Sequence, residues 1–66
     1  MSYSLTLNGI ASNEAFQKAE AHAHAIAWTA LDGGESVALD YDESGEPIDS
    51  TEDFAAITIE VERVTR

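Results

Sequence analysis

Cysteine is absent from the 66-residue chain, so no disulfide can cross-link the fold and no thiolate can bind zinc. No apolar run approaches the roughly 18 residues that a membrane-spanning helix needs. The N-terminal residues alternate between polar and apolar types, without the basic start and continuous apolar core of a signal peptide. We therefore expect a cytoplasmic protein with no membrane partner.

Basic residues are almost absent as well. Lys18, Arg63 and Arg66 stand against 13 acids, which gives a formal net charge of −10. Proteins that bind nucleic acid directly need the opposite sign, because neutralisation of phosphates dominates their affinity. Anionic membrane surfaces are disfavoured for the same reason. The charge thus argues against direct contact with DNA, RNA or lipid headgroups.

The chain is also short. A chain of 66 residues holds one domain and buries only about 60% of the surface that its unfolded form exposes. Good packing or self-association must then supply the stability. We expect residues 1–66 to form a single small acidic domain.

The first half of the chain contains an alternating segment followed by a helical one. Apolar and polar residues alternate over residues 2–8, which predicts a half-buried strand. Ser12 or Asn13 can cap a helix of about 19 residues, and residues 32–34, Asp-Gly-Gly, would end it. An alanine-rich stripe recurs along this helix at helical spacing: Phe16, Ala19, Ala23, Ile26, Ala27, Ala30 and Leu31. These small side chains predict close packing of the helix on a sheet.

The second half predicts two more strands, over residues 37–41 and 54–65. Val64 interrupts the alternation of the last strand, so we expect a bulge or a strand end near Arg63. The resulting order is β-α-β-β, an α+β fold in which a three-stranded sheet carries one helix on one face. The third strand is expected to pair antiparallel with one of the others. If the first two are parallel neighbours, their crossover through the helix is right-handed.

Acidic residues gather in the middle of the chain, where residues 32–53 hold nine of the 13 acids and no base. This segment predicts a surface for a basic protein, such as a nucleic-acid-binding protein whose cleft accepts phosphate. The predicted contact residues are five acids with one of two aromatic anchors: Asp40, Asp42, Glu43, Glu46 and Asp49, with Tyr41 or Trp28. The alternative is a solvated loop that keeps a small domain soluble.

Residues 40–45 also match the opening of a calcium-binding loop, with oxygen-bearing side chains at alternate positions and a glycine at the sixth. The match fails further on, because Thr51 stands where a bidentate glutamate is needed and Pro47 where an apolar residue is usual. A strand and a turn explain the same residues. Calcium binding is therefore the weaker alternative, and no metal site or cofactor is expected.

Catalytic patterns are not evident either. The serines lack a nucleophile elbow with a patterned base, and Gly33-Gly34 lacks the lysine of a phosphate loop. His22 and His24 project about 200° apart on a helix and cannot share a metal ion. We expect His24 to flank the core, within reach of Glu20 and Trp28, and His22 to face water. The sequence predicts a protein that is not an enzyme.

In size, acidity and lack of a catalytic motif, the chain resembles small phage-encoded accessory proteins, including inhibitors of host defence or nucleic-acid enzymes. The resemblance is one of composition and covers no motif. The leading hypothesis is a non-enzymatic protein-binding module, an inhibitor whose acidic surface mimics nucleic-acid phosphate. The alternative is a structural homo-oligomer, in which a helix margin or a sheet edge, such as that of the C-terminal strand, completes the thin core.

Overall fold

Helix α1 (Asn13–Leu31) begins and ends at residues whose capping chemistry explains its limits. The Ser12 hydroxyl accepts a hydrogen bond from the Ala15 amide at 3.1 Å, which satisfies a donor that the first turn leaves free. At the other end Asp32 adopts the left-handed conformation, with φ of 48°. Its amide donates to the carbonyl of Trp28, and the chain leaves the helix there. The predicted helix is confirmed at both ends.

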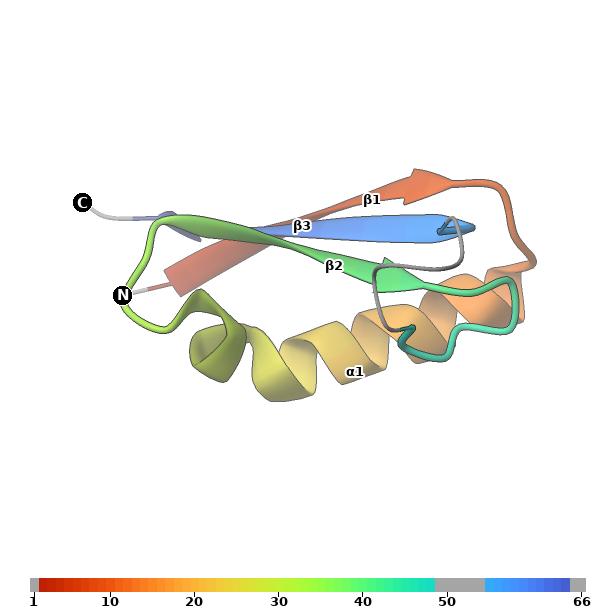
Figure 1. Ribbon diagram of the computed structural model, residues 1–66, viewed down its shortest axis with the longest axis horizontal. Helices are drawn as coiled ribbons and strands as arrows, with labels where there is room; N and C mark the ends of the chain where they lie inside the picture. Colours follow the sequence, from red (N-terminus) through yellow and green to blue (C-terminus); the bar gives the residue numbers. More distant parts are fainter. Residues whose placement is uncertain (1, 49–54, 65–66) are drawn as a thin grey trace.

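The computed structural model describes residues 2–48 and 55–64, and in them the helix covers one face of a three-stranded sheet (Figure 1). The strands are β1 (Ser2–Gly9), β2 (Ser36–Tyr41) and β3 (Ile57–Val64). Their spatial order is β1-β3-β2, and both β1 and β2 pair antiparallel with β3. The predicted α+β class and β-α-β-β order are confirmed.

The central position of β3 rules out two arrangements that the sequence left open. β1 and β2 are not neighbours, because β3 lies between them and pairs with both. The C-terminal strand therefore has no free edge with which to pair across a twofold axis. Of the bulge or strand end expected near Arg63, the structure shows the strand end: the register of β3 with β1 continues without a break from Ile57 to Val64, and the described strand ends at Val64. Val64 points to the open face of the sheet and simply lies opposite Ser2.

The core lies between the helix and the central strand. Ala19, Ala23 and Ala27 are fully buried along α1, and their spacing of four residues places them on one helix face. They meet the fully buried side chains of β3, namely Ile57, Ile59 and Val61. Small side chains on the helix let its backbone approach the sheet, so the branched residues of β3 fill the space between the layers. The alanine stripe thus explains why one helix suffices to cover the central strand.

No helix in the described residues is long and apolar enough to cross a membrane.

Candidate functional site

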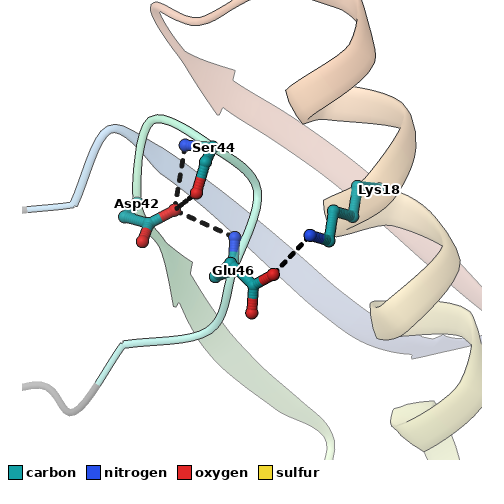
Figure 2. Close-up of polar contacts among 4 residues, drawn as sticks. All are labelled: Lys18, Asp42, Ser44 and Glu46. Carbon is teal, nitrogen blue, oxygen red and sulfur yellow. Dashed lines mark hydrogen bonds and ion pairs between the residues drawn. The ribbon is translucent and has the colours of Figure 1, made fainter.

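Within the predicted acidic segment, an ordered turn follows β2 (Figure 2). One carboxylate oxygen of Asp42 accepts three hydrogen bonds, from the Ser44 amide at 2.9 Å, the Ser44 hydroxyl at 2.7 Å and the Glu46 amide at 2.9 Å. The Glu46 amide, and then Ser44, hold the pKa of Asp42 below its ordinary value. These bonds are those of an Asx turn, in which the side chain replaces a backbone acceptor. Asp42 therefore stabilises the turn.

This turn packs on the helix. Gly45 is buried with φ of +86°, and a Cβ built there would stand 2.5 Å from the Ala15 carbonyl oxygen. On the same side, Lys18 of α1 forms an ion pair with Glu46 (Figure 2). Both side chains are more than half exposed, so solvent screens the pair strongly. The turn is held mainly by its own hydrogen bonds and by the close backbone contact at Gly45.

The described carboxylates do not gather around a common point. No group of three or more histidine, aspartate or glutamate side chains gathers within residues 2–48 and 55–64 in a way that could hold a metal ion. In the calcium-loop interpretation, Asp40 and Asp42 would turn toward one ion. Instead the Asp40 carboxylate accepts a hydrogen bond from the Thr58 hydroxyl at 3.3 Å, whereas Asp42 binds its own turn. The two carboxylates serve different local structures.

The open face of the sheet, opposite the helix, carries a second set of acids that the sequence analysis did not select. Residues alternate between the two faces of a strand, so the burial of Ile57, Ile59 and Val61 sends Glu60 and Glu62 to the open face. Asp40 reaches the same face of β2, where it lies opposite Thr58. We call Asp40, Glu60 and Glu62 the acidic sheet face.

Cations do not offset this face within the described residues. Glu60 lies between Thr6 and Ala38, and Glu62 lies between Ser4 and Ser36, all uncharged neighbours on the flanking strands. Lys18 pairs with Glu46 on the helix side. Arg63 alternates to the helix side of β3 and is half-buried, and its Nε atom is buried without a hydrogen-bond partner in the described structure. Arg63 therefore does not offset the carboxylates of Glu60 and Glu62, which lie on the other face of the sheet.

The aromatic anchors separate into one buried and one exposed residue. Tyr41 is only 1% exposed and belongs to the core, so it does not lie on the surface with the predicted contact acids. Its side chain points under the helix because the alternation of β2 turns it inward, and burial raises its pKa above the ordinary value. Trp28 is 46% exposed and packs edge-on against Tyr3 at a centroid distance of 5.3 Å. Trp28 therefore stays available to a partner.

The two histidines have the opposite surroundings from those expected. His22 is half-buried, and its Nδ1 atom lies 2.7 Å from the Tyr41 hydroxyl. His24 is exposed, with Nδ1 2.9 Å from the Tyr3 hydroxyl and Nε2 3.7 Å from Glu20. Each histidine is one residue, or about 100°, away from the buried Ala23, so the two reach tyrosines on opposite edges of the sheet. The contact between His24 and Glu20 is confirmed.

The predicted contact acids thus divide by surroundings. Asp40 lies on the acidic sheet face, Asp42 and Glu46 are engaged in the turn, and Glu43 is exposed at its tip. Asp49 lies outside the described residues. The turn acids lie near one another, but none of them contacts Glu60 or Glu62 in the described structure. Alternation along the last strand was the sequence signal that could have selected those two glutamates.

Comparison with protein-family models, curated proteins and solved structures finds no match to this chain. Its function is therefore inferred from the residues and geometry above.

Proposed function

We propose that this protein is a non-enzymatic binding module that presents the acidic sheet face, Asp40, Glu60 and Glu62, to a basic surface of a partner protein. The observation that carries the proposal is the one-sided charge of this face. Its three carboxylates have no described cation beside them. Glu60 and Glu62 project from the same face of one strand about 7 Å apart, so their carboxylates repel each other. A partner's lysines or arginines would relieve that repulsion.

The scaffold favours this use of the charges. Glu60 and Glu62 lie on the central strand, which is paired on both sides. Ile59 and Val61 alternate with them along this strand and are fully buried on its other face. The backbone of such a strand is already ordered, so a partner that binds these charges needs to order only their side chains. Complementary potentials would also accelerate the encounter with a basic protein.

The turn supplies a secondary contribution in this proposal. Glu43 is the exposed acid at its tip, whereas Asp42 is committed to its hydrogen bonds and Glu46 to Lys18. Glu43 therefore stays in the proposed contact set, and Asp42 leaves it. The specific form that we propose is an inhibitor in the cytoplasm whose carboxylates occupy the phosphate-binding cleft of a nucleic-acid-binding protein.

The test compares two variants that remove the same amount of charge from different places. The face variant carries Asp40→Asn, Glu60→Gln and Glu62→Gln. The control variant carries Glu20→Gln, Asp32→Asn and Glu35→Gln, which lie on or after the helix. Tagged wild-type protein is used to isolate a partner from host lysate at low salt, and the affinity of the purified partner is then measured across a salt series.

We expect the face variant to bind roughly 3- to 150-fold more weakly, because its three exposed charges contribute about 0.2–1 kcal/mol each. It should also show a smaller salt dependence, whereas the control should resemble the wild type. Duplex DNA should displace the protein from its partner if the face mimics phosphate. Equal weakening of both variants would reduce the effect to net charge and contradict the proposal, as would a partner whose binding ignores salt.

A further inference from the structure

Among residues 2–48 and 55–64, no strand pairs with the outer edge of β1. β3 pairs on both sides, so only β1 and β2 have outer edges. The outer edge of β2 is covered at one end, where Tyr41 bridges to Pro47 and the Ile48 amide donates to the Asp40 carbonyl. β1 (Ser2–Gly9) pairs with β3 alone among the described residues. Its other side presents unpaired backbone groups over eight residues.

This open edge lacks the features that normally protect edge strands. Proteins discourage pairing at an edge with charged side chains, proline or a bulge. Residues 1–13 contain no charged residue and no proline, although the chain as a whole has a net charge of −10. The register of β1 with β3 runs from Ser2 to Gly9 without a bulge. β1 is therefore an uncharged edge strand, able to pair with another strand, on an otherwise acidic molecule.

The helix also covers β1 incompletely. The inward side chains Tyr3, Leu5 and Leu7 are half-buried, whereas the matching residues of β3, such as Ile59 and Val61, have 0% exposure. Beside Tyr3 stands Trp28, the partly exposed aromatic residue of α1. An additional strand on this edge would extend the sheet and cover the exposed parts of this apolar row.

The hydrogen-bonding direction of β1 can be followed from its neighbours. The Arg63 amide donates to Glu35, on the β2 side of β3. Because successive residues of a strand point their backbone groups to opposite sides, Glu62 and Glu60 face β1, where they meet Ser4 and Thr6. The backbone groups of Tyr3, Leu5 and Leu7 then point outward. The residues with inward side chains are thus the ones that can bond a new strand.

We propose that this edge binds β1 of a second copy, antiparallel about a twofold axis at Leu5, to form a continuous six-stranded sheet. Leu5 then pairs with Leu5 of the second copy, and Tyr3 pairs with Leu7 of the second copy. Each of these pairs exchanges two backbone hydrogen bonds. On the open face, Ser4 lies opposite Thr6 of the second copy.

A second copy suits this edge better than an unrelated strand because the register is self-complementary. Apolar residues meet apolar residues on the helix side, and neutral polar residues meet on the open side, so no two acids oppose each other across the new pair. The symmetric pairing is isologous and closes after two copies. The strongly acidic turn after β2 lies at the opposite edge of the sheet, where repulsion between copies is weakest.

Sedimentation equilibrium tests the edge with two matched variants. Ser4→Lys with Thr6→Lys places lysines opposite Glu62 and Glu60 within the same chain, which favours the fold, but sets lysine against lysine across the proposed dimer. Ser36→Lys with Ala38→Lys makes the same charge change opposite the same two glutamates on β2. We expect the β1 variant to raise the dimer dissociation constant about tenfold or more, and the β2 variant to remain dimeric.

Cysteine cross-linking tests the register, since the chain has no native cysteine. Ser4 and Thr6 of the second copy form a non-hydrogen-bonded pair, with Cα atoms about 4.5 Å apart, which suits a disulfide. A mixture of Ser4→Cys and Thr6→Cys proteins should form the mixed disulfide on mild oxidation, far faster than Ser4→Cys protein alone. A wild-type protein that stays monomeric to about 1 mM, or a dimer that neither lysine variant weakens, would overturn the proposal.

Salt separates this proposal from the binding function above, on which it does not rest. Two copies of charge −10 repel each other, so added salt should strengthen the β1 dimer. The same salt should weaken binding of the acidic sheet face to a basic partner. Loss of either behaviour therefore identifies which of the two proposals has failed.

Discussion

At the scale of single residues, the structure assigns roles that depend on partners far away in the chain. Tyr41 and Tyr3 carry the same side chain on two outer strands, and each reaches one histidine of the helix. Tyr41 is nevertheless buried and Tyr3 is half-buried. The difference arises because the turn at residues 42–47 closes over the β2 end of the sheet, where Pro47 bridges to Tyr41. The Tyr41 phenol is therefore kept from water.

This burial predicts a loss of stability at alkaline pH. The pKa of Tyr41 is raised above 10.0 in the folded protein. Above pH 10.0 the unfolded chain releases the phenol proton while the folded chain still retains it, so rising pH favours unfolding. We expect the contribution of Tyr41 to be complete below pH 10 and to decline as the pH rises toward its folded-state pKa.

Tyr41→Phe measures this contribution directly. At pH 7 the variant should lose about 1 kcal/mol with the hydrogen bond to His22. Urea unfolding of both proteins from pH 7 to pH 11 should show this difference shrinking only above pH 10. A difference that stays constant over the whole range would contradict the role given to the phenol.

At the scale of elements, the sequence predicts what local spacing and capping determine. The alanine stripe and the caps at Ser12 and Asp32 define α1 because each depends on residues within one or two turns. The order of the strands was not predictable in the same way. It depends on which strand pairs with both others, and all three have the same alternating pattern. In retrospect, β3 alone combines three inward branched aliphatic residues, Ile57, Ile59 and Val61, which suit a central position.

The candidate site was predictable only in part for a related reason. Clustering along the chain selected the turn acids, and Asp42 and Glu46 indeed lie close together there. Glu60 and Glu62 join Asp40 only through the pairing of β2 with β3, which sequence proximity does not reveal. Arg63 follows Glu62 directly in the sequence, although alternation sends their side chains to opposite faces.

The contact between the turn and the helix gives a prediction for Gly45. Gly45 and Gly33 both have positive φ, +86° and +79°, and both lie in turns. A Cβ at Gly45 would meet the Ala15 carbonyl oxygen at 2.5 Å, whereas one at Gly33 would meet nothing within 4 Å. Gly33→Ala should therefore lose only the backbone term, about 1 kcal/mol. Gly45→Ala should lose about 1–3 kcal/mol more, because the turn must move away from α1.

Urea unfolding of the two glycine variants at pH 7 measures both values. Proteolysis near the turn offers a second readout, since an undocked turn should be cleaved sooner in Gly45→Ala than in Gly33→Ala. Equal destabilisation of the two variants would mean that the turn does not pack on the helix as the structure has it.

At the scale of the whole molecule, one small domain supports strongly unequal surfaces. The helix side holds Lys18 and the inward Arg63, the open side holds the acidic sheet face, and β1 is neutral. A net charge of −10 on 66 residues opposes the compact state through self-repulsion. This repulsion should be greatest where carboxylates share a surface without cations.

Salt should therefore stabilise the protein, and the acidic sheet face should account for much of the effect. The Debye length falls from about 10 Å at 0.1 M to about 3 Å at 1 M ionic strength, which is shorter than the spacing of about 7 Å between Glu60 and Glu62 along β3. We expect sodium chloride to raise the melting temperature of the wild type over this range, by roughly 4–8 °C for each 1 kcal/mol of repulsion that it screens. Micromolar protein keeps the measurement on the monomer.

The two charge variants locate the source of this repulsion. Asp40→Asn with Glu60→Gln and Glu62→Gln should melt higher than the wild type at 0.1 M salt and respond less to added salt. Glu20→Gln with Asp32→Asn and Glu35→Gln removes the same charge but should retain more of the salt response, because its residues are scattered over the helix and the following loop. Equal responses would mean that the repulsion is spread over the whole molecule and is not concentrated on the acidic sheet face.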